Sequence, residues 1–398
     1  MKKIVFSAVV MLFLGLVVSC NKEVIPTVIV NVKVLFPNNY SQPNAAAVKV
    51  TLTNRADGSS QVATTDANGT AIFNDVLLGT FNLTASKSLS AQEAQILTGF
   101  LQALELNASR NGVVIMETPN PLNLELRLTG SALGNLVIKE VYYTGSRTPA
   151  GGTYFSDQFV EIYNNSTDTI YLDKLCIADV YGASGQINAT TKPTDFQADM
   201  ANTYLSSVWQ IPGTGKQRPL LPGQSIIIAQ DGVNHKDPTL NPNSPVDLSK
   251  AGWETYNERP DNRDADAPAV PNLERLYFTG GFDWLLPVFG PGVVIFRTLD
   301  FDKLEKVAIP GSTLAARIKL PNAQVIDAFE ALQNGNSSNF KRVPTALDAG
   351  FFFADDTYNT QSARRKTAAT IGNRRVLQDS NNSTSDFEKI AKPTPKGF

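Results

Sequence analysis

Four sets of side chains in this sequence have the types that catalysis or ligand binding requires: one histidine, two glutamates, a run of aspartates and a group of aromatics. His235 is the only histidine, and it lies in a polar stretch without a recognisable nucleophile motif. Any Ser-His or Cys-His centre would depend on it. The single histidine excludes a histidine-rich metal site, and two cysteines are too few for a structural zinc site.

The two glutamates, Glu140 and Glu161, lie in strand-like runs that we expect to be neighbours in a sheet. Two carboxylates on an open cleft can hydrolyse a glycosidic bond, one as the acid and the other as base or nucleophile. The alternative is that each carboxylate caps backbone amides at one end of a sandwich. We favour this structural role, and we predict that the chain is not an enzyme.

The aspartate run is the sequence DNRDAD, in which Asp261, Asp264 and Asp266 offer oxygen ligands. Ca²⁺ takes six to eight oxygens, so these residues are a candidate calcium site. The run lacks the central Gly and the distal Glu of a helix-loop-helix calcium site, and Arg263 lies inside it. The alternative is a solvated acidic loop. We expect no other cofactor.

Aromatic residues gather between positions 253 and 289, and others lie in a long polar stretch, 181–221, which we interpret as an insertion between strands. Aromatic faces stack on sugars or anchor a partner, and long ordered insertions often carry recognition surfaces. The alternative is that the same side chains form a core. The candidates for ligand or partner binding are Trp209, Trp253, Tyr256, Tyr277 and Trp284.

Charge composition argues against a nucleic-acid partner. The formal net charge is −2, and a chain without Lys2 and Lys3 would be more acidic still, which does not attract phosphate backbones. A basic cluster at 364–366 and 374–375 has two interpretations, an anion-binding site or paired surface charges. We favour paired charges, because isolated surface pairs are common and weak.

The elements that must position these residues read as strands. Gly and Pro together number 50, from 27 and 23, and helix-period patterns are scarce. This composition is typical of many short strands joined by turns, so we predict an all-β protein. At 398 residues the chain is long enough for two or three domains.

Residues 1–20 have the pattern of an export signal: Lys2 and Lys3, an apolar run too short to span a bilayer, and the end LVVSC. These last residues resemble a bacterial lipobox, which implies cleavage before Cys20 and its acylation. Several acyl chains together give stable anchoring. The following Asn21-Lys22-Glu23 resembles a weak surface-export signal, so we expect a lipid anchor in the outer membrane with the protein facing outward. Cys176 lies in an apolar strand and is expected to be a buried thiol.

Residues 24–130 are predicted to be a first β-sandwich. Residues 24–36 alternate, with four valines on one face, and the capping box Ser90 to Glu93 opens a helix expected to reach about residue 104. The string TTDANGTAIFNDVLLGTFNLTAS, at 64–86, resembles carboxypeptidase regulatory-like domains. That resemblance implies a transthyretin-like sandwich without a catalytic centre. We place a domain boundary in the flexible stretch 129–134.

Residues 135–390 are predicted to be a second sandwich. Strand-like runs at 136–143, 159–163 and 169–173 are expected to form one antiparallel sheet. The strings VIKEVYY, DQFVEIYN and SIIIAQ resemble the lamin-tail domain, which implies an immunoglobulin-like sandwich elaborated by long loops. The strings VWQIPG, WLLPVFGPGVVIF and RVLQDSNNSTSDFE resemble a family of uncharacterised Bacteroidetes lipoproteins.

This family resemblance implies an outer-membrane lipoprotein associated with a TonB-dependent transporter barrel, and it brings no catalytic residues. We therefore expect a lipid-anchored binding or accessory protein that captures a ligand through the loops of its second domain. One alternative is a structural or adhesive surface protein without a small ligand. A further alternative is a glycan hydrolase that uses Glu140 and Glu161.

Overall fold

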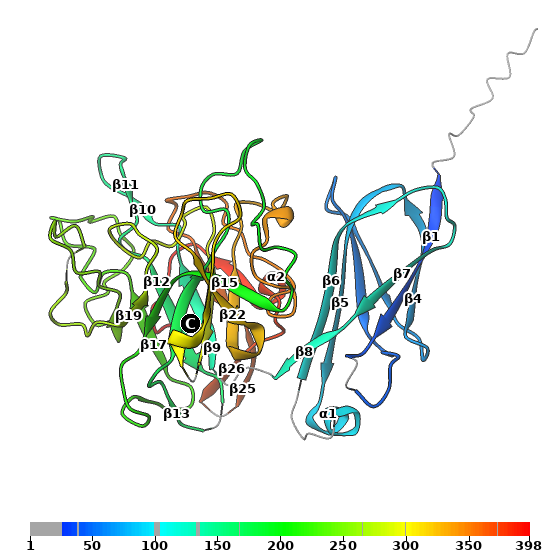
Figure 1. Cartoon of the computed structure of the whole chain (residues 1–398), viewed down its shortest axis with the longest axis horizontal. Coiled ribbons are helices and arrows are strands. Elements are labelled where there is room, and N and C mark those ends of the chain that lie inside the picture. Colours follow the sequence, from blue (N-terminus) through cyan, green and yellow to red (C-terminus); the bar gives the residue numbers. More distant parts are fainter. Residues whose placement is uncertain are drawn as a thin grey trace, which may run out of the picture.

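The protein is described here from a computed structural model that covers residues 26–37, 40–98, 104–132, 136–166, 168–264, 266–298, 300–371 and 373–398. Two bodies lie side by side, residues 26–132 and residues 136–398 (Figure 1). Both consist almost entirely of strands and loops, which confirms the predicted all-β class. Within the described residues, no helix combines the length and apolar character needed to cross a membrane.

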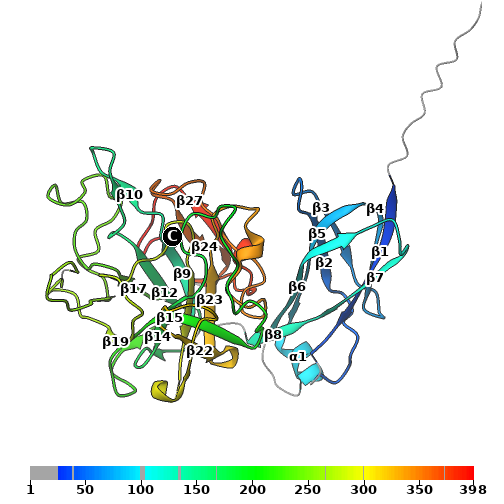
Figure 2. The ribbon, with the colours of Figure 1, turned by 45° about the horizontal axis from the view of Figure 1, so that its top comes forward.

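The first domain packs a three-stranded sheet, β4-β1-β7, against a five-stranded sheet, β3-β2-β5-β6-β8 (Figure 2). One core cluster joins the two sheets, and Val32 of β1 and Leu83 of β5 are completely buried within it. The strands are β1 (Thr27–Leu35), β2 (Lys49–Asn54), β3 (Ser60–Thr64), β4 (Thr70–Leu77), β5 (Gly79–Leu89), β6 (Leu104–Ile115), β7 (Leu122–Arg127) and β8 (Thr129–Ala132).

The alternation in β1 works as expected. Val28, Val30, Val32 and Val34 are all buried, because successive side chains of a strand point to opposite faces. The capping box also forms: Ser90 N donates to Glu93 Oε2 at 2.8 Å, and Glu93 N donates to Ser90 Oγ at 3.3 Å. Helix α1 covers Ala91–Thr98 among the described residues, and Leu104, the expected end of the helix, is already the first residue of β6.

The second domain packs a six-stranded sheet, β18-β17-β12-β9-β24-β27, against a sheet in the order β21-β22-β15-β14-β20-β23, in which β19 also pairs with β15. Ile138 of β9 and Ile295 of β20 belong to the cluster between them. The strands are β9 (Leu136–Tyr142), β12 (Phe159–Asn164), β14 (Cys176–Val180), β15 (Asn202–Gln210), β17 (Ser225–Ala229), β18 (Trp253–Glu254), β19 (Glu274–Tyr277), β20 (Gly292–Phe296), β21 (Glu305–Val307), β22 (Arg317–Pro321), β23 (Val325–Glu330), β24 (Ser362–Arg365) and β27 (Phe387–Ile390).

Small elements complete the second domain. Three two-stranded sheets are β10-β11, β13-β16 and β25-β26. Their strands are β10 (Ser146–Arg147), β11 (Thr153–Tyr154), β13 (Ile170–Tyr171), β16 (Pro219–Leu220), β25 (Thr367–Ile371) and β26 (Arg374–Leu377). The short helices are η1 (Phe301–Lys303), η2 (Asn322–Gln324), η3 (Ser338–Phe340) and α2 (Ser383–Asp386).

The expected single sheet for residues 136–173 is wrong in its third strand. β9 and β12 pair antiparallel, but β13 pairs with β16 in a separate sheet, and β17 takes the place beside β12. The Asp173 carboxylate accounts for this arrangement, because it accepts hydrogen bonds from the backbone N–H groups of Gln217 at 3.0 Å and Arg218 at 2.9 Å. These bonds hold the chain after β13 against the segment that contains β16.

Buried charge is a second feature of this domain. The Arg365 guanidinium lies within 2.6 Å of Asp327, 3.1 Å of Asp379 and 3.5 Å of Asp386, all side chains being at most 4% exposed. Its neighbour Arg364 pairs with Glu388 at the surface, at 2.8 Å. The basic residues 364 and 365 are therefore paired, as favoured from the sequence, but the burial of Arg365 was not expected.

Candidate functional site

The loop between β14 and β15 departs from the sandwich pattern, and two cavities form around it. It covers residues 181–201, which we call the insertion; the predicted insertion ran to 221, but β15 occupies its second half. Gln197 Nε2 donates to Asn339 O at 2.8 Å, and Arg342 Nη1 donates to Ala183 O at 3.1 Å. Arg342 is itself bound to Glu330 at 3.2 Å, so the insertion is tied to the end of β23.

A cavity of about 570 Å³, the insertion pocket, lies between the insertion and the loop after β19. Tyr181 and Phe278 are half-buried aromatic members of its lining, while Trp284 is only 3% exposed. Three acidic and three basic side chains balance each other around it. They are Asp179, Asp195, Asp283, Lys192, Arg317 and Arg342.

Polar groups inside the insertion pocket are held in fixed positions. Trp284 Nε1 donates to Asp179 Oδ1 at 2.9 Å, and burial raises the pKa of this carboxyl. The Arg317 guanidinium lies 4.4 Å from the centre of the Tyr181 ring, and burial lowers its pKa. The Arg317 side chain also lines the pocket, and its Nε is buried and has no hydrogen-bond partner among the described residues. The pocket thus combines aromatic faces with charged side chains.

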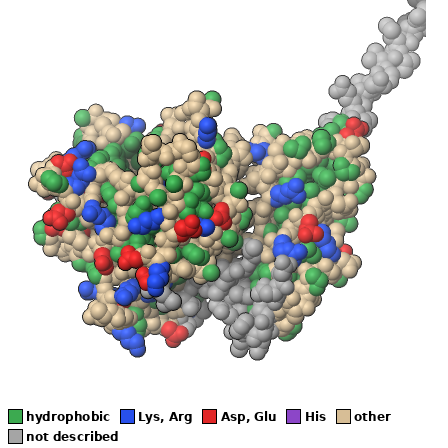
Figure 3. All heavy atoms as spheres, viewed as in Figure 1, with side chains coloured by type: hydrophobic (Ala, Val, Ile, Leu, Met, Phe, Trp, Pro, Cys, Tyr) green, Lys and Arg blue, Asp and Glu red, His purple; other side chains and the backbone are tan. Residues whose placement is uncertain are grey.

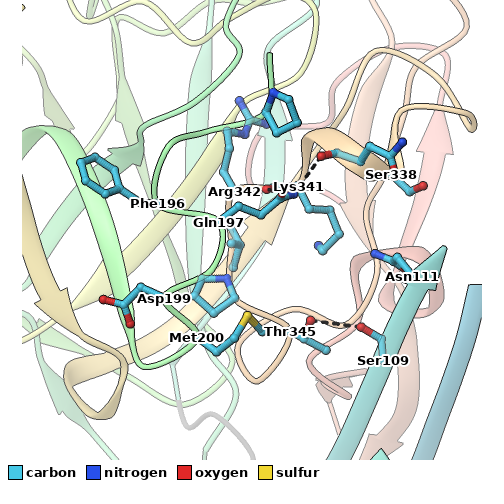
Figure 4. A pocket seen from close by; sticks show the side chains of 14 residues that line it. Ser109, Asn111, Phe196, Gln197, Asp199, Met200, Ser338, Lys341, Arg342 and Thr345 are labelled. Atoms are coloured by element: carbon cyan, nitrogen blue, oxygen red, sulfur yellow. Dashed lines mark hydrogen bonds between the residues drawn. The ribbon is translucent and has the colours of Figure 1, made fainter. Parts of the chain in front are cut away.

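A second cavity, of about 450 Å³, lies on the other side of the insertion, between the two domains (Figure 4). Ser109 of β6 donates to Thr345 Oγ1 across it at 3.0 Å. Phe196 of the insertion also lines it and stacks on Tyr204, with ring centroids 3.8 Å apart. Pro193 of the insertion lines both cavities. The insertion is therefore the wall between them.

An acidic cluster lies next to the insertion pocket. Ligand atoms of Asp231, Asp264 and Asp283 all lie within 4.8 Å of one another. Burial raises the pKa values of these carboxyls, to about 8 for Asp231, about 7 for Asp264 and about 6 for Asp283, and repulsion by neighbouring carboxylates adds to the rise for Asp231 and Asp264. Asp283 also lines the insertion pocket, so the cluster and the pocket meet at this residue.

The calcium site predicted on Asp261, Asp264 and Asp266 does not form as expected. Asp261 pairs with Arg259 at 2.7 Å, and Asp266 accepts a hydrogen bond from Asn272 at 2.7 Å. Only Asp264 turns inward, where it joins two aspartates from other loops. Nothing in the local sequence spacing marks Asp231 and Asp283 as its neighbours, because 33 and 19 positions separate them from Asp264.

The aromatic candidates divide into core and partly exposed residues. Trp209, Trp253 and Trp284 are exposed by 0%, 5% and 3% and belong to the second domain's core cluster, which corrects their selection as surface stacking residues. Tyr256 and Tyr277 are half-buried. The Tyr277 hydroxyl donates to Ala316 O at 2.9 Å, so one edge of its ring is already engaged.

The two glutamates lie directly opposite each other on β9 and β12, but they face the end of the chain. Glu140 accepts from Thr394 N at 3.0 Å, and Glu161 pairs with Lys139 at 2.8 Å and accepts from Lys396 N at 3.1 Å. Both are completely buried. They hold residues 394–396 in place, which corresponds to the structural role favoured from the sequence.

His235 and the cysteines have ordinary surroundings. His235 is buried, with Nδ1 at 2.7 Å from the Tyr154 hydroxyl and Nε2 at 3.0 Å from Asp231 O, and burial lowers its pKa to about 4. Cys176 is a buried free thiol, as predicted, and burial raises its pKa to about 11. Cys20, the predicted lipidation site, lies outside the described residues.

Surface charge offers no alternative site on the face in Figure 3, where basic and acidic side chains are interspersed over both domains. A field of one sign is what a nucleic-acid interface requires. This face is therefore of mixed charge.

Comparison with known proteins places the chain near one uncharacterised family. Residues 221–394 match the family model described as "Protein of unknown function (DUF4876)". The chain is similar to the crystal structure of a DUF4876 family protein from Bacteroides thetaiotaomicron, with 27% identity, 93% of this chain and 97% of that chain covered, and a TM-score of 0.60. The expected likeness to uncharacterised Bacteroidetes proteins is confirmed at this level, and no curated protein matches the sequence.

Other structural similarities are weak. A candidate carbohydrate-binding protein from Pseudomonas aeruginosa is 14% identical, covers 26% of this chain and 89% of its own, and has a TM-score of 0.20. A candidate adhesin from Bacteroides ovatus is 6% identical, covers 75% of this chain and 86% of its own, and has a TM-score of 0.19. Such scores carry no argument about function.

Proposed function

We propose that this protein is a lipid-anchored binding protein of the outer membrane that captures a neutral polar ligand, such as an oligosaccharide, in the insertion pocket. The observation that carries the proposal is the fixed insertion. A loop of this length is ordered only at an entropic cost, and here hydrogen bonds from Arg342 and Gln197, the first of them part-buried, hold it as the wall of a cavity of about 570 Å³. Cavities of this size accommodate small ligands.

The chemistry of the lining supports a neutral ligand. Three acidic and three basic side chains around the pocket give no net charge to attract an ion. Tyr181 and Phe278 offer aromatic surface, and the exposed side chains of Lys192 and Asp195 offer a hydrogen-bond donor and an acceptor. Sugars present both apolar ring faces and hydroxyl groups, and such surfaces are complementary to aromatic rings flanked by polar groups. We propose binding without catalysis, because Glu140 and Glu161 lie beneath residues 394–396.

An array of microbial and host glycans, probed with the purified protein, tests this proposal. We expect Tyr181→Ala and Phe278→Ala to weaken binding of the best glycan by about tenfold or more, because each removes an aromatic contact. Tyr171→Ala is the matched control, since Tyr171 is 36% exposed and lies outside the pocket lining. Absence of glycan binding by the wild type, or equal loss in the control, would contradict the proposal.

Membrane anchoring through Cys20 is the second part of the proposal, supported by the lipobox-like end of residues 1–20. Cys20→Ala should move the protein from the outer-membrane fraction to the soluble fraction. Protease treatment of intact cells should degrade the wild-type protein if it faces outward. Retention of the Cys20→Ala variant in the membrane fraction would contradict the lipid anchor. Full protection of the wild-type protein from protease would contradict the outward orientation.

A TonB-dependent barrel is the proposed partner, on the family resemblance alone. A mild-detergent pull-down of the acylated protein from its own outer membrane, followed by mass spectrometry, should recover such a barrel in near-stoichiometric amount. Recovery of the lipoprotein alone would favour a free-standing binding protein or an adhesin.

A further inference from the structure

Three long loops of the second domain meet at the acidic cluster. Asp231 follows β17, Asp264 lies between β18 and β19, and Asp283 lies between β19 and β20. Their carboxylate oxygens lie within 4.8 Å of one another. Oxygens that ligate Ca²⁺ lie 2.3–2.6 Å from the ion, so two ligands of one ion are at most about 5 Å apart. The three carboxylates can therefore reach a single cation.

The polar atoms around this point are buried but lack partners. Asp264 Oδ1, Asp283 Oδ1 and Gln230 Oε1 have no hydrogen-bond partner among the described residues, and their side chains belong to residues only 3–5% exposed. Gln230 Nε2 donates to Asp283 Oδ2, which brings the neutral amide to the cluster. A buried oxygen without a donor costs free energy unless something else binds it.

No basic side chain among the described residues forms an ion pair with Asp231, Asp264 or Asp283. The charge of Arg259 acts on Asp264 only from a greater distance, because its guanidinium pairs with Asp261. The nearby Glu254 is already engaged, because it accepts from Gly232 N at 2.6 Å and Ala267 N at 2.8 Å. Buried charges are normally paired with an opposite charge or bound to a metal ion. This cluster has no ion-pair partner among the described residues, so a bound metal ion is the remaining arrangement.

We propose that Asp231, Asp264, Asp283 and Gln230 form a binding site for a hard divalent cation of the Ca²⁺ type. The donor set consists only of oxygens, which suits Ca²⁺, Mg²⁺ or Mn²⁺ rather than Zn²⁺. Three carboxylates and one amide supply four oxygens, and up to seven if the carboxylates bind through both oxygens. Asp231 is the least buried of the three, so it marks the entry side.

The ion would link three long loops that are otherwise held by few strand–strand hydrogen bonds. Asp283 lines the insertion pocket and precedes Trp284, so a cation at the cluster fixes one wall of that pocket. The cation site stands on its own atoms, and it does not depend on whether the pocket takes a sugar.

Metal titration of the full-length protein after chelator treatment tests the site. Adding Ca²⁺ should raise the melting temperature by several degrees, because a ligand that binds only the folded state stabilises it. Half-saturation is expected at about 10⁻³ M or below, the range of extracellular calcium modules. Tryptophan fluorescence should change with the same midpoint, since Trp284 adjoins Asp283. Mg²⁺ and Mn²⁺ are titrated in parallel.

Two double variants distinguish cation binding at this site from a non-specific effect of acidic surface charge. Asp264→Asn with Asp283→Asn should abolish the cation-dependent shift. Asp261→Asn with Asp266→Asn removes the same charge from the same region, but these side chains point to Arg259 and Asn272, so the shift should remain. If the first double variant fails to fold, the single variant Asp231→Asn is used instead. It should lose at least tenfold in affinity for the cation.

Several results would overturn the proposal: no shift in the wild type with any of the three cations, a shift that survives Asp264→Asn with Asp283→Asn, or unchanged affinity in Asp231→Asn. Glycan binding is measured on the same samples. Loss of glycan binding with cation binding intact would count against the proposed function alone.

Discussion

The two domains bury different kinds of side chain. Among its described residues, the first domain buries Thr65 and Asn107 as its polar members, and the rest of its core is apolar. The second domain buries Lys139, Glu330 and Arg365 together with many carboxylates. Several of the connections in the first domain are short turns, such as those between β3 and β4 and between β4 and β5. The difference indicates that buried polar anchors are what allow the second domain to hold long loops in fixed positions.

The largest expected effect on the second domain comes from removing the buried charge of Arg365. Arg365→Met leaves Asp327 and its neighbours as buried charges without a counter-ion, and we expect a loss of about 3–5 kcal/mol in the free energy of unfolding. All three tryptophans lie in the second domain, so denaturation followed by tryptophan fluorescence measures this domain alone. Arg364→Met is the control; it breaks a part-exposed pair with Glu388 and should cost at most about 1 kcal/mol.

The first domain should respond to apolar truncation instead. Leu83→Ala leaves a cavity at a completely buried position and should cost about 2–5 kcal/mol. Circular dichroism or hydrogen exchange of β1–β7 should detect the loss, while the tryptophan-monitored transition of the second domain stays unchanged. Equal destabilisation of both transitions would mean that the domains unfold as one unit. That result would contradict the claim that the two domains are stabilised separately by different kinds of buried side chain.

Dependence on pH should be a property of the second domain. Burial raises the pKa of Glu140 from 4.5 to about 7, helped by repulsion from Glu161. Its contribution to stability is fully present below the unfolded pKa and is lost as the pH rises through about 7. Glu140→Gln should therefore make the stability profile shallower between about pH 4.5 and 7 and stabilise the protein above pH 7 by up to roughly 3 kcal/mol.

Urea denaturation at several pH values, followed by tryptophan fluorescence, measures this effect. Glu388→Gln serves as the control, because that carboxylate is part-exposed, at 43%. A wild-type profile that is flat from pH 5 to 8, or a variant profile as steep as that of the wild type, would be incompatible with a buried carboxyl at Glu140.

The sequence predicted the first domain well because its information is local. The valine alternation of β1 and the capping box at Ser90 depend on neighbours a few positions apart, and both form as expected. The fate of residues 169–173 depends on Asp173 and a turn some 40 positions later. No local pattern reveals such a bond, and this is why the third strand of the expected sheet was assigned wrongly.

The candidate site depends even more on distant contacts. The insertion was recognised from its polar composition, but its length was overestimated because Tyr204 and Trp209 are strand residues of β15. Asp264 was selected as a metal ligand, yet its partners Asp231 and Asp283 come from other loops. Arg317, whose guanidinium lies over the Tyr181 ring in the insertion pocket, is at the start of β22 without a distinguishing motif.

Hydrogen exchange across residues 181–201 of the wild-type protein tests the central claim most directly, namely that the insertion is a fixed wall. Tyr181 N donates to Tyr204 O at 2.8 Å, and Ile187 N donates to Gln333 Oε1. We predict that these amides exchange about 100-fold or more slowly than those of an unstructured chain, an opening free energy of about 3 kcal/mol. Exchange at the rate of an unstructured chain, with β14 and β15 still protected, would contradict the claim.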